Sequence, residues 1–309
     1  MVFFDPVSPQ SEADTSVAEG VSEPPGALQN REASVRELIV VVILIAISSL
    51  TLLPFWIEAN DRIFATIPEL HSVPVALHQG LRWFAVAVDA APGLILGALG
   101  LRLSARIGLV PFRVLSGRTW GDLRPQIRPL VRRWIWLGSA LFLITIAVTV
   151  PQFLLFGLAP PPGTSSRSVS QHQAVIGVMT QMLSARAAPA FAIGAPILEE
   201  VEFRLFLLAL VAWLCVRMRT WNGKDLPRFA LATAIIVSGF AFGLGHVVSS
   251  QSVAWWRPWY LQILTDPRGY LGMVLGYVYW RWGLESTIGA HAVWNILVIA
   301  AAKLATVVI

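Results

Sequence analysis

The chain has 309 residues, of which 56% are hydrophobic and only 13% charged, and its mean hydropathy is +0.66. This composition excludes an ordinary soluble domain and indicates a membrane protein with several spans. The net charge of +5 does not indicate a nucleic-acid partner, because eight arginines fall between Arg102 and Arg133, in one segment flanked by apolar runs, as expected of a cytoplasmic connection.

The N-terminal segment, residues 1–35, is predicted to be a disordered tail. It contains six acidic residues, four prolines and no sustained apolar run. A cleavable signal peptide needs a basic start followed by an apolar stretch, and neither is present here. We therefore expect the first span to remain in the mature protein as an uncleaved anchor.

Apolar segments along the rest of the chain predict an all-α fold, a polytopic transmembrane bundle of about seven to eight helices. An additional short interfacial helix is possible at residues 171–187. Residues 36–187 form the N-terminal transmembrane helices and the basic cytoplasmic loop. The expected spans lie within residues 38–57, 83–103, 134–158, 189–216, 229–255, 256–282 and 284–309.

The arginines between Arg102 and Arg133 also predict the orientation, since basic loops stay in the cytoplasm. A second basic loop contains Arg217, Arg219, Lys224 and Arg228, and it falls on the same side. The N-terminus is then cytoplasmic, and the expected location is the plasma membrane.

Four charged residues interrupt the fourth span within six positions: Glu199, Glu200, Glu202 and Arg204. Each charge at a bilayer centre costs roughly 2.5–3.5 kcal/mol, so such a cluster indicates a functional site. Glu200 and Arg204 are at i and i+4 and can pair on one helical face. Glu199 points elsewhere by about 100° and is the candidate catalytic carboxylate.

Two other spans place polar pairs at the same spacing. Phe242 and His246 lie on the fifth, where Gly243 and Gly245 permit close approach of a helix or ligand, and His291 and Asn295 lie on the seventh. A carboxylate and an imidazole can activate a water, while a second imidazole and an amide can stabilise an oxyanion.

A metal site is a second interpretation of these residues. Two histidines and a glutamate are a common zinc set, although the His-Glu-x-x-His signature is absent. Cys215, the only cysteine, excludes a cysteine-based metal site and a disulfide within the chain. No cofactor is assigned, and a divalent metal such as zinc remains open.

The three motifs, in order on successive spans, resemble those of the CAAX prenyl endopeptidase and bacteriocin-processing (CPBP, or Abi) intramembrane proteases. They are Glu199-Glu200-x-x-x-Arg204, Phe242-x-x-x-His246 and His291-x-x-x-Asn295, and the likeness covers roughly residues 188–300. It implies a catalytic helix core over residues 188–309, a protease of the metal-dependent or glutamate type, and peptide or lipidated-protein substrates in contact with membrane lipid.

The resemblance also implies individual roles. Glu199 with His246 would activate the water, His291 with Asn295 would form the oxyanion site, and Glu200 with Arg204 would shape the site. Two alternatives remain: a non-catalytic scaffold or immunity protein with the same fold, and a proton-coupled transporter.

The catalytic interpretation requires a shared membrane depth. Hydropathy places Glu199 in mid-membrane, His246 toward the outer end of its span and His291 toward the inner end of its own. They meet if the fifth helix covers residues 232–254 and the seventh begins near Arg281.

Overall fold

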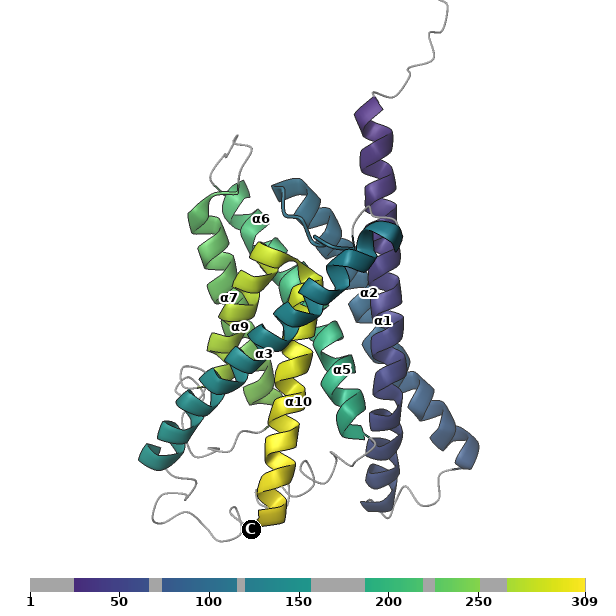
Figure 1. Cartoon of the computed structure of the whole chain (residues 1–309). Coiled ribbons are helices and arrows are strands. Elements are labelled where there is room, and N and C mark those ends of the chain that lie inside the picture. The colour runs from purple at the N-terminus through teal and green to yellow at the C-terminus, as the bar shows by residue number, and fades with distance from the viewer. Residues whose placement is uncertain are drawn as a thin grey trace, which may run out of the picture.

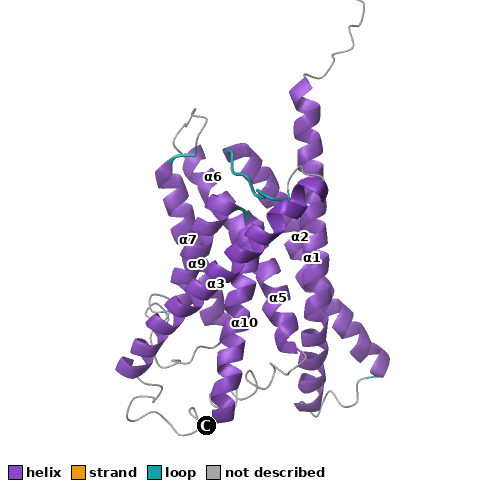
Figure 2. Cartoon of the chain, in the orientation of Figure 1, coloured by secondary structure: helices purple, strands orange, loops and turns teal. Residues whose placement is uncertain are grey.

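The computed structural model describes residues 25–66, 74–115, 120–156, 187–218, 226–250 and 266–308. Within these residues the chain forms seven helices and no strand, which confirms the predicted all-α fold (Figure 2). One of the seven is a continuous run made of α5, a π-helical segment η2 and α6. The elements are α1 (Pro25–Thr66), α2 (Val75–Ile107), α3 (Trp120–Phe156), α5 (Ala187–Glu200), η2 (Val201–Leu208), α6 (Ala209–Arg217), α7 (Arg228–Ser250), α9 (Pro267–Trp282) and α10 (Leu284–Val308).

Five of these helices are long and apolar enough to cross a membrane, and the chain is an integral membrane protein. The spans are Val35–Glu58, Val86–Ile107, Gly121–Val148, Arg228–His246 and Leu284–Leu304. The α9 helix has only 16 residues, about 24 Å at 1.5 Å per residue. It is therefore shorter than the hydrocarbon core of a bilayer, which is about 30 Å thick.

Two helices begin earlier than expected. The α1 helix starts at Pro25, inside the segment expected to be a tail, and α3 starts at Trp120, inside the segment expected to be a basic loop. Arg124, Arg128 and Arg132 thus lie on the exposed surface of a helix. Arginine is a good helix former, so a run of arginines does not by itself mark a loop.

Some expectations concern residues outside the described part of the chain. These are the expected interfacial helix at 171–187, except for its last residue, and the first half of the sixth span. The described part of the sixth span begins with Asp266, whose carboxylate accepts the backbone N–H of Arg268 and caps α9.

The run α5–η2–α6 lies at the centre of the bundle and positions the site. It contacts α1 and α2 on one side and α7 and α10 on the other. Figure 1 shows α3 crossing the front of the bundle obliquely, with α1 and α2 on one flank and α7 and α9 on the other. The α10 helix packs against both α3 and α5, and α7 packs against α9.

Close helix approach depends on glycines at the crossing points. A Cβ atom at Gly100 of α2 would lie 2.5 Å from the carbonyl oxygen of Leu205 in η2, and one at Gly272 of α9 would lie 2.8 Å from the Cα atom of Gly239 in α7. Real Cβ atoms do not approach backbone this closely. These glycines therefore let neighbouring helices pack backbone against backbone, as small residues do in membrane bundles.

We predict that Gly100→Ala lowers the free energy of unfolding by roughly 1–3 kcal/mol, because the added methyl group meets backbone that cannot swing away. Gly80→Ala on the same helix is the matched control, since no atom of the described residues lies within 4 Å of the methyl carbon that alanine would add there. Both changes gain the same helix propensity, about 1 kcal/mol. Chemical unfolding in detergent measures the free energy of unfolding of both variants. Equal changes in Gly100→Ala and Gly80→Ala would contradict the close contact between α2 and η2.

Candidate active site

Three helical segments bring the sequence-predicted polar residues together. Glu199 and Glu200 are the last two residues of α5, and Arg204 follows one turn later in η2. The other residues come from α7 and α10, which both contact this run: they are Phe242, His246, His291 and Asn295.

Glu200 and Arg204 form a fully buried ion pair. Both side chains have 0% exposure, and Nε of Arg204 lies 3.0 Å from Oε2 of Glu200. The distance is that of a close pair, although Nε–H is not aligned for a hydrogen bond. Nη2 of Arg204 donates to the carbonyl oxygen of Gly272 in α9 at 3.3 Å. The guanidinium carbon also lies 4.5 Å from the centroid of the Phe242 ring, a cation–π contact.

Glu200 has a second partner, which the sequence did not indicate. Its Oε1 atom lies 2.8 Å from Nδ1 of His291, a residue that is 1% exposed. Because the carboxylate is paired with Arg204, it is an acceptor, and Nδ1 of His291 is assigned as the donor. One carboxylate therefore links η2 to α10.

Glu199 faces both imidazoles. Its Oε2 atom lies 3.5 Å from Nε2 of His291, and its Oε1 atom lies 3.9 Å from Nε2 of His246. The Glu199 and His246 side chains are 23% and 27% exposed, whereas His291 is buried. The separation of the two glutamates into a paired and an accessible carboxylate follows the expectation from helical geometry.

His246 is also oriented through its other ring nitrogen. Nδ1 lies 2.9 Å from the carbonyl oxygen of Phe242, one turn earlier in α7. Since a carbonyl can only accept, Nδ1 carries the proton and Nε2 keeps its lone pair. In the neutral form of either histidine, the nitrogen with the lone pair is then the one that faces Glu199, and in the doubly protonated form the same nitrogen carries a donor N–H.

Phe242 separates the buried ion pair from the accessible part of the site. It is fully buried, and its ring centroid lies 4.5 Å from that of His246 and 5.6 Å from that of His291. Phe203 of η2 meets the Phe242 ring edge-on at 5.4 Å. The aromatic ring thus fixes the spacing of both imidazoles and shields Arg204.

Asn295 is placed one turn beyond His291 on α10 and is half-buried. Its side chain makes no hydrogen bond with any residue in the described part of the chain. The neighbouring Trp294 donates its Nε1–H to Oγ1 of Thr145 at 2.9 Å, which fixes this turn of α10 against α3. The oxyanion role of Asn295 remains a prediction.

The two histidines and Glu199 reach one depth because α10 begins inside the bundle. Figure 1 shows α10 starting below the upper ends of α6 and α7 and extending further down. His291 is in the N-terminal third of α10, and His246 is near the C-terminal end of α7. The lower start of α10 therefore compensates for the fact that His291 is near the beginning of its helix while His246 is near the end of its own.

The π-helical form of η2 was not expected from the sequence. It begins at Val201, directly after Glu200, and contains Arg204. The wider i→i+5 turn changes which side chains share a face beyond Glu200, and π-helical turns are frequent at functional sites. Apolar periodicity cannot reveal it, because the whole segment is apolar apart from the charged residues.

Glu285 connects two segments of the chain through hydrogen bonds. It is 5% exposed, and its carboxylate accepts the backbone N–H groups of Arg113 (2.8 Å) and Val114. It therefore ties the segment after α2 to the start of α10.

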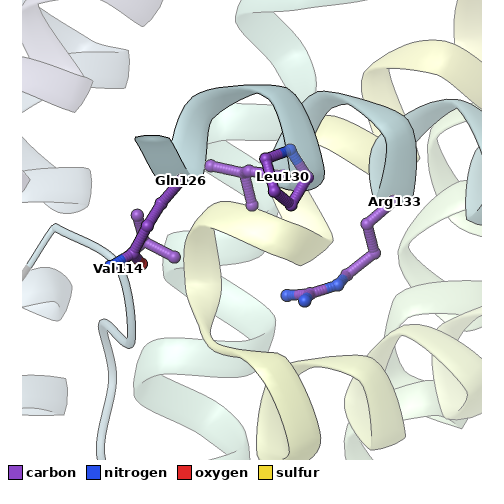
Figure 3. A pocket seen from close by; sticks show the side chains of 5 residues that line it. Val114, Gln126, Leu130 and Arg133 are labelled. Carbon is purple, nitrogen blue, oxygen red and sulfur yellow. The ribbon is translucent and has the colours of Figure 1, made fainter. Parts of the chain in front are cut away.

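A hollow of about 90 Å³ lies beside this junction, and none of Glu199, Glu200, His246 and His291 lines it (Figure 3). Arg133 extends from α3 beside it and donates to Oγ of Ser286 at 3.4 Å. The lining residues are Val114, Gln126, Pro129, Leu130 and Arg133. None of them is a predicted site residue.

The side chains of Glu199, His246 and His291 are candidate ligands for a metal ion. Two imidazole nitrogens and one carboxylate are ligands that zinc takes. As these side chains lie, however, no group of three or more His, Cys, Asp or Glu residues in the described part of the chain is arranged to hold a metal ion. The Glu199 carboxylate and Nε2 of a neutral His246 are two acceptors, which suit the two hydrogens of a water molecule.

Comparison with known proteins supports the resemblance in the sequence. The family model described as type II CAAX prenyl endopeptidase Rce1-like matches residues 181–297, a segment that contains all seven predicted site residues. Searches of curated proteins and of solved structures gave no match. The match confirms the family predicted from the three motifs. Residues 181–297 of this integral membrane protein thus match the Rce1-like type II CAAX prenyl endopeptidases, and the match supports membership of the CPBP family, a family of proteases.

Proposed function

We propose that this chain is an intramembrane endopeptidase that hydrolyses a peptide bond with a water activated by Glu199 and His246. The observation that carries the proposal is the position of the Glu199 carboxylate, 3.5 Å and 3.9 Å from two imidazole Nε2 atoms. Polar atoms at such separations are commonly bridged by water. The carboxylate is also the accessible member of the Glu199–Glu200 pair.

In the proposed reaction, Glu199 takes a proton from the water while Nε2 of His246 accepts its other hydrogen. The water oxygen bonds to the carbonyl carbon of the scissile peptide, and the carbonyl oxygen becomes an oxyanion. The C–N bond then breaks, and the proton held by Glu199 passes to the departing amine. The products are a carboxylic acid and an amine, which exchange a proton at neutral pH to give a carboxylate and an ammonium ion, so no co-reactant other than water is needed.

His291 and Asn295 are the proposed oxyanion donors. The Asn295 amide donates through its side-chain N–H. His291 donates through Nε2 in its protonated form, which the Glu200 carboxylate at Nδ1 stabilises, much as a buried carboxylate stabilises the imidazolium of a hydrolase triad. Glu200 and Arg204 act as positioning residues in this proposal.

The proposed substrates follow from the family and from the membrane setting. A CAAX-type or peptide-maturation substrate, delivered as a peptide or a lipidated protein, would reach a site formed by membrane helices. We further propose that the protein resides in the plasma membrane with its N-terminus in the cytoplasm, because the exposed arginines of α2 and α3 gather at one end of the bundle.

Glu199→Gln is expected to reduce peptide cleavage by at least about 10²-fold, because the amide cannot accept the proton from water. The substitution keeps the size of the side chain, so the unfolding temperature should not change. Turnover of a quenched fluorogenic peptide ending in a prenylated CAAX sequence measures the effect. Glu202→Gln, the same chemical change one turn away, is the control, and we expect it to remain within a few-fold of wild type. Equal activity in wild type and Glu199→Gln would remove Glu199 from the mechanism.

Breaking the Glu200–Arg204 pair should destabilise the bundle. Glu200→Gln leaves the Arg204 charge buried and is expected to cost roughly 3–5 kcal/mol, whereas Glu200→Gln combined with Arg204→Met should cost less than the sum of the single changes. Unfolding in detergent of the wild type, both single variants and the double variant gives the coupling. Additive losses would mean that the two side chains do not stabilise each other.

Cleavage is expected to persist within about twofold after prolonged treatment with EDTA or 1,10-phenanthroline, since a water held by Glu199 and His246 requires no metal. A zinc-dependent reaction would behave differently, because two imidazoles and a carboxylate release the ion to a strong chelator. Activity lost on chelation and restored by zinc would overturn the metal-free mechanism and keep the same residues as ligands.

A further inference from the structure

Three glycines lie on α7 within seven residues: Gly239, Gly243 and Gly245. A glycine inside a helix costs stability relative to alanine, because its backbone loses more freedom on folding. Each therefore calls for a physical reason. Gly239 and Gly243 have one, since a Cβ atom would lie 2.6 Å from the Met273 nitrogen and 2.9 Å from the Gly269 nitrogen, respectively. Both are needed for the packing of α7 on α9.

Within the part of the chain that the structure describes, Gly245 has no such packing role. It is exposed, and a Cβ atom there would meet only Cζ of Phe203 among the described residues, at 3.7 Å. That is an ordinary van der Waals distance, so an alanine would fit without displacing anything. The unfavourable residue at this position is thus not explained by packing against the described residues.

The position of Gly245 relates it to the site. With about 100° per residue, Gly245 lies about 60° to one side of Phe242, and Gly239 and Gly243 lie about 60° and 100° to the other side. The packing glycines therefore face α9, and Gly245 is on the flank next to Phe203 of η2.

The accessible part of the site lies next to this flank, because His246 is about 100° from Gly245 around α7 and Phe203 is four residues after Glu199. Gly245 immediately precedes His246, whose side chain is 27% exposed, and Glu199 opposite is 23% exposed. The bare α7 backbone thus adjoins the exposed edges of the residues that would activate the water. A Cβ atom added at Gly245 would adjoin these exposed edges and, among the described residues, would meet only the Phe203 ring.

We propose that Gly245 is a substrate-positioning residue: its missing side chain lets an extended peptide segment lie along α7 beside the Phe203 ring and present its scissile carbonyl to Glu199. The inference rests on the proposed function. The segment is extended because a carbonyl within a helix is already hydrogen-bonded and screened by its own side chains. The Phe203 ring and the exposed Leu244 suit an apolar segment.

The test is a graded series, Gly245→Ala and Gly245→Leu, assayed with the prenylated fluorogenic CAAX peptide. We expect kcat/KM to fall with side-chain size, by at least tenfold for leucine and mainly through KM. The unfolding temperature should stay the same or rise, because both residues favour a helix more than glycine does. Loss of activity together with gain of stability is an outcome that a packing role does not produce.

Two variants of α7 serve as controls. Ala232→Leu adds bulk at another exposed position, 13 residues and more than three turns away, and should leave cleavage within twofold. Gly243→Ala introduces a clash with Gly269 and should lower the unfolding temperature. If Gly245→Leu lowers the unfolding temperature as Gly243→Ala does, Gly245 is a packing residue and the inference is wrong.

A measurement of peptide binding tests the role of Gly245 independently of the proposed catalytic role of Glu199. The affinity of a fluorescently labelled prenylated CAAX peptide is measured for Glu199→Gln protein with and without Gly245→Leu, and we expect at least tenfold weaker binding with leucine. Unchanged binding and unchanged kcat/KM in the Gly245 series would overturn the inference while leaving Glu199 as the proposed base. Activity retained in Glu199→Gln would instead overturn the proposed mechanism, and the binding comparison would still decide the role of Gly245.

Discussion

The Glu200 carboxylate holds the site together, because it has two buried partners from different parts of the chain. Arg204 lies one helical turn away in η2, and His291 comes from α10. A carboxylate and a guanidinium without exposure to solvent are costly in an apolar bundle unless they are paired. The pairing therefore couples the register of α10 to that of the α5–η2–α6 run. Glu199, the preceding residue in the chain, is left accessible as a consequence of this arrangement.

The backbone around this interaction is shaped to allow it. The π-helical turn begins directly after Glu200, and Gly100 brings the α2 backbone against Leu205 in that turn. On the other side, Gly272 lets α9 approach α7 and also supplies the carbonyl oxygen that accepts Nη2 of Arg204. The same close packing thus provides both van der Waals contact and a partner for a buried charge. Stability and the geometry of the site depend on the same few backbone contacts.

The sequence predicted the helical class, the positions of most spans and the pairing of Glu200 with Arg204, because these depend on local hydropathy and on i, i+4 spacing. It did not predict the contact between His291 and Glu200, since spacing within one helix carries no information on which helix lies opposite. It also missed the π-helical turn and the early start of α3, because apolar and arginine-rich sequences are compatible with several helix boundaries. The depth of α10 was decisive for the site, and only the packed bundle determines it.

The central claim is that Glu199 and His246 hold a water opposite His291 and Asn295. The most direct measurement is an experimental structure of the protein in a lipid nanodisc, at a resolution that shows ordered water, with an uncleaved prenylated peptide bound to the Glu199→Gln variant. The account predicts a water within about 3 Å of residue 199 and of Nε2 of His246, with the scissile carbonyl directed toward Asn295 and Nδ1 of His291 bonded to Glu200. A site filled by packed apolar side chains, with the peptide bound elsewhere on the bundle, would contradict it.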